Sequence, residues 1–277
     1  MKKLEVQGER RLEKFKRRFE ADRRRQTARN SREQEERQVA AQLRNVDRFA
    51  KRVLFEDARL LVVDKPVGIA TMGAEKDEES LFTLAQRYVK IKYDKPGAVY
   101  LGVVSRLDLT TSGVVVFARN SKAAERLNAQ FRDHKVQKRY RALVEGVLQE
   151  NEQELVDVIC EDKANRRLWI PQPCVDVYER YKKFDPKEAR LTYRVVRRFK
   201  NTTLIDVDLK TGRKHQIRLQ LSNVGAPIVG DGKYGARPIP QLGVCLHASS
   251  LTLTHPTTRQ ETTFNAAQPD WSAWERD

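Results

Sequence analysis

Three separated stretches of the chain hold the side chains best suited to chemistry. They are residues 105–113 (Ser-Arg-Leu-Asp-Leu-Thr-Thr-Ser-Gly), 211–218 (Thr-Gly-Arg-Lys-His-Gln-Ile-Arg) and 227–235 (Pro-Ile-Val-Gly-Asp-Gly-Lys-Tyr-Gly). A carboxylate such as Asp108 can act as a nucleophile. An isolated Arg-Leu-Asp is most often part of a surface ion pair. Asp108, however, is followed by Thr-Ser-Gly between two apolar segments, with the other two stretches downstream, and this favours an active site centred on Asp108.

Several other kinds of site are excluded by the pattern of residues. Residues 225–230 have the length of a phosphate-binding loop, but Asp231 stands where that loop requires Lys. A hydrolase that used Ser105 with His215 would need a Gly-x-Ser-x-Gly turn, which the chain lacks. The four histidines and three cysteines show no metal-ligand spacing, so we expect no metal and no cofactor.

Together and in this order, the three stretches resemble the RluA-type family of RNA pseudouridine synthases. Residues 61–68 (Leu-Val-Val-Asp-Lys-Pro-Val-Gly) resemble the first strand and turn of that family, and the resemblance covers roughly residues 54–265. It implies isomerisation of a uridine to pseudouridine in structured RNA, either rRNA or tRNA, after the base is flipped out of its stack. In this reaction Asp108 would be the catalytic carboxylate, and neither metal nor cofactor would be needed.

The resemblance also assigns roles to other side chains. Arg218 would pair with Asp108, which would keep the carboxylate ionised and oriented. Tyr140 would stack on the uracil and lend its hydroxyl to proton removal, although ordinary strand packing is the alternative. Arg106 would hold the target base out of the RNA stack, or else bind a phosphate. The remaining residues expected to bind the substrate are Leu246, His215, Arg213 and Ser105.

Ser105 departs from the family pattern, which most often has His at this position. Serine keeps a hydrogen-bond donor but lacks the ring and its positive charge, which affects RNA affinity and target choice more than the reaction class. An RNA-binding or RNA-remodelling protein of the same fold with weak or lost catalysis is therefore the alternative function. The complete set of Asp108, Tyr140 and Arg218 argues against that alternative.

The overall charge is consistent with an RNA partner. The 277 residues include 54 Lys and Arg against 38 Asp and Glu, a net charge of +16, which favours a polyanionic partner. No apolar run is long enough to span a membrane, and the first residues lack the apolar region of a secretory signal. Three cysteines are typical of a reducing compartment, so we expect a cytoplasmic protein, and we expect a monomer.

Strand-rich segments with few helices predict an α+β fold with a mixed, mainly antiparallel sheet over residues 54–277. The resemblance implies a central RNA-binding cleft in this domain. We predict helices at 80–91, 121–134 and 215–223, with Ser80 and Ser121 as the N-caps of the first two. Residues 150–184 are polar and predict an irregular excursion. The predicted strands are residues 60–64, 99–104, 114–118, 136–147, 191–199, 204–209, 245–253 and 262–264.

Residues 1–53 predict a basic helical extension. Residues 1–52 contain 18 Lys and Arg against 9 Asp and Glu, a net charge of +9, and they lack proline. An apolar stripe from Val39 to Val53 is expected to pack on the catalytic domain. The earlier part either projects toward RNA or is a solvated, partly disordered extension.

Deletion of residues 1–36 tests the role of this extension. The deletion removes 13 Lys and Arg and 8 Asp and Glu, a net charge of +5. We expect weaker RNA binding with a shallower dependence of log affinity on log salt, because phosphate contacts release counterions without reading sequence. The modified uridine and the rate at saturating RNA should stay the same. An unchanged salt slope would favour the solvated extension, and a moved modification site would mean that the extension reads the target.

Overall fold

The computed structural model describes residues 44–73, 79–239 and 243–273, and the chain divides into two units, Met1–Lys51 and Arg52–Asp277. In the first unit, residues 44–50 are helical. The helices expected over residues 1–43 lie outside the described residues, and packing of the apolar stripe on the second unit stays a prediction. Within the described ranges, no helix combines the length and apolar character needed to cross a membrane.

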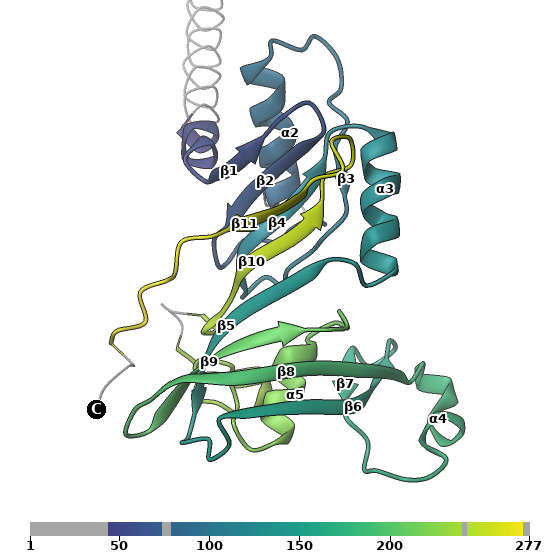
Figure 1. Ribbon diagram of the computed structural model, residues 1–277, viewed down its shortest axis with the longest axis vertical. Coiled ribbons are helices and arrows are strands. Elements are labelled where there is room, and N and C mark those ends of the chain that lie inside the picture. Colours follow the sequence, from purple (N-terminus) through teal and green to yellow (C-terminus); the bar gives the residue numbers. More distant parts are fainter. Residues whose placement is uncertain (1–43, 74–78, 240–242, 274–277) are drawn as a thin grey trace, which may run out of the picture. The chain divides into compact units, whose positions relative to one another are not determined.

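The second unit is built on one sheet, which contains eleven strands among the described residues (Figure 1). Its strand order is β1-β2-β4-β10-β5-β9-β8-β6-β7, with β3 also paired to β4 and β11 to β10. The pair β4–β10 is parallel and the other strand pairs are antiparallel, so the predicted α+β fold is confirmed. The strands are β1 (Val53–Glu56), β2 (Leu60–Lys65), β3 (Gly102–Val103), β4 (Ser112–Ala118), β5 (Gln137–Glu145), β6 (Glu152–Asp162), β7 (Arg167–Trp169), β8 (Lys187–Arg198), β9 (Thr202–Leu209), β10 (Leu246–Thr254) and β11 (Glu261–Asn265).

The two longest helices of the second unit begin at side chains that satisfy one of their first backbone N–H groups. Ser80 is the N-cap of the first long helix, as predicted, and accepts from Thr83 N. The prediction for the second was wrong, because its cap is Asn120, whose Oδ1 accepts from Ala123 N at 2.9 Å. Asn120 has the extended backbone of an N-cap, whereas Ser121 is already helical. The helical elements are α2 (Leu81–Lys92), α3 (Ser121–Arg132), α4 (Val177–Arg180), η1 (Lys182–Phe184), α5 (Gln216–Asn223) and η2 (Gly232–Tyr234).

Two strand predictions were wrong. Residues 150–184 are not irregular throughout, because they contain the long strand β6, which pairs with β8 from Glu152 opposite Arg194 to Ile159 opposite Lys187. Residues 99–104 form only the short strand β3. One edge of β4 is occupied by β2, and the other edge pairs with β3 at Phe117 and Ala118 and with β10 at Ser112 and Gly113. Just beyond β3, Val116 N donates to the hydroxyl of Ser105 and not to a backbone carbonyl.

Among the described residues, the two largest apolar cores lie one on each half of the unit, and a smaller cluster is formed by Ile159, Leu168, Ala189 and Leu219. The first half packs β2 and β4 against α3, with Val116 and Leu127 among its fully buried residues. The second half packs β5, β8 and β9 against α5, with Ile205 and Leu221 buried. Strand β10 joins the halves, because Leu246 belongs to the second core whereas residues further along the strand belong to the first (Figure 1). The position of one half relative to the other therefore depends on the pairing of β10.

Gly113 permits the parallel pairing of β4 with β10. It lies opposite Ala248, has a backbone φ of +113°, and a Cβ atom at this position would collide with the carbonyl group of Ala248. Both the conformation and the close approach of the two backbones require glycine.

Gly113→Ala should therefore lower the free energy of unfolding by at least about 1–3 kcal/mol, because alanine adds strain at a positive φ and pushes β4 from β10. Gly97→Ala is the matched control, since no heavy atom lies within 4 Å of the added Cβ there. Urea denaturation of both variants measures the difference. Equal stability of the two variants would contradict this role of Gly113.

Candidate active site

A cavity of about 520 Å³ lies between the two cores. Its apolar walls come from both halves of the sheet, with Val114 and Leu251 from the first core and Ile217 and Leu246 from the second. The volume is within the range of about 300–1,000 Å³ that is common for small-molecule sites. All eight site residues proposed from the sequence line this cavity, namely Ser105, Arg106, Asp108, Tyr140, Arg213, His215, Arg218 and Leu246.

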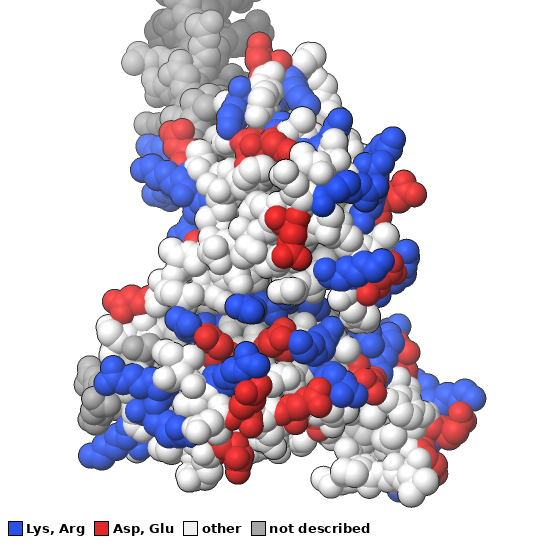
Figure 2. All heavy atoms as spheres, in the orientation of Figure 1, with Lys and Arg blue, Asp and Glu red and all other residues white. Residues whose placement is uncertain are grey.

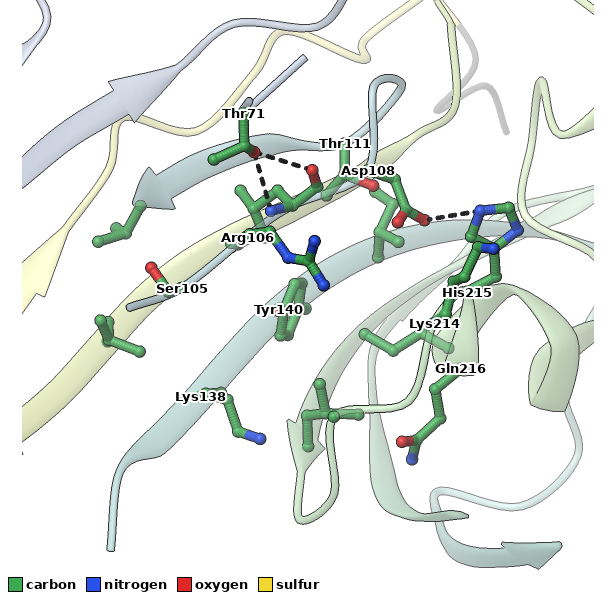
Figure 3. A pocket seen from close by; sticks show the side chains of 18 of the residues that line it. Thr71, Ser105, Arg106, Asp108, Thr111, Lys138, Tyr140, Lys214, His215 and Gln216 are labelled. Carbon is green, nitrogen blue, oxygen red and sulfur yellow. Dashed lines mark hydrogen bonds and ion pairs between the residues drawn. The ribbon is translucent and has the colours of Figure 1, made fainter. Parts of the chain in front are cut away.

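The loop that carries Asp108 is held by the segment that follows β2. The hydroxyl of Thr71 donates to Leu107 O at 2.9 Å and accepts from Leu107 N at 3.1 Å (Figure 3). Gly68 N donates to Leu109 O at 2.9 Å. The backbone on both sides of Asp108 is therefore tied to residues 68–71, which restricts the positions that the carboxylate can occupy.

Lys65 adds a further restraint on the loop that carries Asp108. Its side chain is fully buried, and Nζ donates to the carbonyl oxygens of Pro66, Ile69 and Leu109. Burial lowers the pKa of Lys65 to about 8, and the nearby charge of Asp108 opposes that shift. A buried ammonium is tolerated here because all three of its hydrogens are satisfied by carbonyl groups.

Asp108 and Asp231 share the guanidinium of Arg218. Arg218 Nη1 donates to Asp108 Oδ2 at 3.2 Å, so the pairing expected from the sequence is present. Nε and Nη2 of the same side chain donate to Asp231 at 2.7 and 2.8 Å. The Arg218 side chain is 7% exposed and that of Asp231 only 1%, whereas that of Asp108 is 27% exposed. Asp231 thus fixes the guanidinium from the interior, and Asp108 presents the free side of its carboxylate to the cavity.

Burial alone would lower the pKa of Arg218, because it disfavours the charged guanidinium. The two carboxylates outweigh that penalty and raise its pKa, with Asp231 contributing more than Asp108. The arginine is therefore charged at every pH at which the protein is folded.

His215 lies beside the same carboxylate. Its Nε2 is 3.9 Å from Asp108 Oδ2 (Figure 3). Its Nδ1 is 2.7 Å from the hydroxyl oxygen of Tyr234. Burial lowers the pKa of His215 to about 4, although the charge of Asp108 acts in the opposite direction, so the ring is neutral at pH 7. The neutral ring is held on one side by Tyr234 and places no second cation beside Asp108, from which it is too distant for a hydrogen bond.

The helix that carries Arg218 begins one residue later than predicted. His215 is the N-cap and has a left-handed backbone with φ of 54°, so α5 starts at Gln216. Gln216 Oε1 accepts from Thr211 Oγ1 at 2.7 Å and from Arg213 N at 3.0 Å. These bonds close the turn that leads from β9 into α5, and the turn brings His215 toward Asp108 while Arg218 follows on the helix.

Tyr140 lines the cavity from β5, where it pairs with Val207 on β9. Burial and, secondarily, the charge of Asp108 raise its pKa, so its hydroxyl keeps its proton at neutral pH. The hydroxyl can therefore donate a hydrogen bond to a ligand in the cavity.

The hydroxyl of Ser105 is already engaged by the backbone of β4. It accepts from Val116 N at 3.0 Å and is 3.4 Å from Val116 O. Arg213 Nε donates to Glu188 O at 2.9 Å, and Leu246 is buried at the start of β10. Contacts of these three residues with a substrate stay predictions.

Sequence reasoning missed four residues that position the site: Lys65, Thr71, Asp231 and Tyr234. Lys65, Asp231 and Tyr234 lie in stretches that the sequence singled out, but sequence analysis assigned these three residues no role. The signal that was available is chemical, because a charged side chain within an apolar turn needs a buried partner. In the described part of the chain, no group of His, Cys, Asp and Glu is arranged to hold a metal ion.

Removal of Arg218 should destabilise the fold. Arg218→Met leaves Asp231 buried without its partner, and the loss of one member of a buried pair costs about 3–5 kcal/mol. The double variant Arg218→Met with Asp231→Asn should recover most of that loss, because the buried charge is then gone. Urea denaturation monitored by circular dichroism tests both variants. If the single and double variants unfold at the same urea concentration, the Asp231 charge is not compensated by Arg218.

Comparisons with known proteins identify the family of the chain. Residues 59–223 match the family model described as RNA pseudouridylate synthase. The ribosomal large subunit pseudouridine synthase C of Pasteurella multocida is 34% identical over 84% of this chain and 69% of its own length. The dual-specificity RNA pseudouridine synthase RluA of Haemophilus influenzae is 33% identical over 77% of this chain and 91% of its own.

Among solved structures, human RNA pseudouridylate synthase domain containing 4 shares the fold. Its TM-score is 0.67 at 21% identity, and the match covers 82% of this chain and 92% of that one. Because the family model spans more than half of the chain and the relatives exceed 30% identity, the chain belongs to the RluA-type family of RNA pseudouridine synthases.

Proposed function

We propose that this enzyme converts specific uridines of structured RNA, either rRNA or tRNA, into pseudouridine, with Asp108 as the catalytic carboxylate. The observation that carries the proposal is the position of Asp108, whose carboxylate is fixed by Arg218 on one side and open to the cavity on the other. The names of the relatives support an RNA substrate, since one acts on the ribosomal large subunit and another is called dual-specificity.

The reaction breaks the bond between the ribose and N1 of uracil and rejoins the base through C5. N1 takes up a proton and the hydrogen on C5 is released, so substrate and product are isomers. The base must stay in the enzyme while it turns, which requires a closed cavity and a group that stabilises the detached ribose. Asp108 supplies either a nucleophile or a negative charge at that point.

The residues around Asp108 have complementary roles in this proposal. Tyr140 packs against the uracil, and its protonated hydroxyl donates a hydrogen bond during the rearrangement. The uridine reaches the cavity only after it leaves the RNA stack, which costs a few kcal/mol, and Arg106 fills the vacated space. Arg218 keeps the Asp108 carboxylate in place, and the neutral His215 lies beside it.

RNA binding without catalysis is the alternative, and one assay distinguishes the two functions. We expect the enzyme to release tritium from RNA labelled at C5 of uridine. Asp108→Asn should abolish release, because an amide can serve neither as the nucleophile nor as the charge, while RNA affinity stays within a factor of a few. Asp94→Asn is the matched control, since Asp94 has a left-handed backbone that asparagine tolerates, and it lies outside the cavity lining.

Turnover by Asp108→Asn would contradict the assignment of the catalytic residue. If the protein without substitutions releases no tritium from labelled total RNA, the result would favour the alternative function. Mapping of pseudouridines in RNA from cells with and without the gene identifies the target. A cytoplasmic location, a monomeric state and the division at residue 53 into an extension and a catalytic domain are part of this proposal.

A further inference from the structure

A second pocket of about 620 Å³ lies between β7 and α5, outside the cavity that holds Asp108. We call it the β7–α5 pocket. Its polar and aromatic lining comes from three elements that are distant in sequence: Arg166, Arg167 and Trp169 at β7, Asn223 at the end of α5, and Lys233 and Tyr234 in η2.

The lining of this pocket carries positive charge and no carboxylate. Arg166, Arg167 and Lys233 make no ion pair with any residue in the described ranges. Some neighbouring cations are paired, since Lys214 lies 2.9 Å from Glu161 and Lys182 lies 3.3 Å from Glu179. On the face shown in Figure 2, acidic and basic side chains are interspersed over the lower half of the molecule. The β7–α5 pocket instead combines three cations with a lining that contains no carboxylate, although Asp162 lies opposite Arg167 in the β6–β7 pair.

The cations are combined with aromatic rings. The guanidinium of Arg167 lies over the Trp169 ring, 5.5 Å from its centroid, and Lys233 Nζ lies 5.8 Å from the centroid of Tyr234. Trp169 is held in place by Phe184, whose ring packs edge-on at a centroid distance of 4.9 Å. Cations that bind phosphates beside rings that stack on bases are the usual components of a site for single-stranded nucleic acid.

Tyr234 connects this pocket with the active site. Its ring lines the β7–α5 pocket, its hydroxyl contacts His215, and Arg218 lies over the ring at 5.0 Å from the centroid. Both of those contacts line the cavity that holds Asp108. An RNA strand whose target uridine enters the cavity can therefore continue past Tyr234 into the second pocket.

We propose that the β7–α5 pocket binds a nucleotide of the same RNA strand, next to the target uridine in sequence or a few positions away. Arg167 and Lys233 contact its phosphates, and the base packs against Trp169 or Tyr234. This inference rests on the proposed function, because it assumes that the substrate is an RNA strand that extends beyond one nucleotide.

The test compares two charge reversals of equal size. One variant carries Arg167→Glu and Lys233→Glu in the pocket, and the control carries Arg59→Glu and Lys122→Glu, which are exposed residues in the β1–β2 turn and α3. The probes are fluorescein-labelled oligouridylates of about 4 and about 16 nucleotides, the range that single binding modules for single strands cover. Fluorescence anisotropy over a series of KCl concentrations gives Kd and its dependence on salt.

We expect the pocket variant to bind the longer probe at least about tenfold more weakly, and the slope of log affinity against log salt to fall by about 1.4, since two phosphate contacts to a single strand are lost. Affinity for the shorter probe should not change, and the control should change neither value by more than a factor of about two. A variant with Arg167→Lys and Lys233→Arg should keep the affinity of the unchanged protein, which shows that charge and not misfolding causes the loss.

Equal weakening by the pocket variant and the control would overturn the proposal, because only the overall charge would then matter. Unchanged affinity of the pocket variant for the longer probe would overturn it as well. Neither result depends on catalysis. Failure of the proposed function would instead appear as a lack of tritium release by the unchanged protein, whatever the binding data show.

Discussion

The shared guanidinium of Arg218 is the interaction on which the active site depends. A buried arginine is costly unless its donors are satisfied, and here three of them reach carboxylate oxygens on two separate segments of the chain. Asp231 provides the bidentate contact and Asp108 the single one. The stronger contact therefore anchors the guanidinium in the interior, while the weaker one leaves Asp108 free to interact with a substrate. Helix α5, the η2 turn and the loop that carries Asp108 are brought to one point by this network.

The sheet places these three segments where the network can form. The loop that carries Asp108 precedes β4 in one half of the domain, whereas α5 belongs to the core of the other half. Strand β10 holds the halves together through its parallel contact with β4 at Gly113 and its antiparallel contact with β5. The cavity thus lies where two cores meet, and small changes in the β4–β10 contact are expected to reach Asp108. The clamp formed by Lys65, Gly68 and Thr71 limits how far the loop can move in response.

The sequence was informative where a residue's role follows from its own chemistry and its local neighbours. Asp108 and Arg218 could be singled out because both lie in stretches that resemble those of the RluA-type family, and Ser80 was predicted as a cap because serine is a favoured N-cap residue. Strand β6 was not predicted, because charged residues are interspersed with its apolar residues and obscure the pattern of the side chains that face the core. Asn120 and Ser121 are both good caps, and only the backbone conformation of Asn120 decides between them.

Other features depend on contacts between distant segments, which no local pattern contains. The left-handed backbone of His215 follows from the turn that Gln216 closes, and beyond the short strand β3 the Val116 N–H of β4 is bound by the side chain of Ser105. Asp231 lies in a glycine-rich turn, and its role is evident only once Arg218 is beside it. The hydroxyl of Ser105 likewise accepts a hydrogen bond from Val116 N. The presence of serine at a position where the family most often has histidine did not predict this contact.

The most direct test of this account is the single-turnover rate of Asp231→Asn at saturating RNA. Asp231 is 1% exposed, so it cannot touch the RNA, and it acts only through the position of Arg218. If the network orients Asp108, the rate of pseudouridine formation should fall by about a hundredfold or more, since about 2.7 kcal/mol of transition-state stabilisation corresponds to that factor, while the Kd for RNA is unchanged. A rate equal to that of the unchanged enzyme, with Arg218 intact, would show that Asp108 is positioned without Asp231 and would contradict the account.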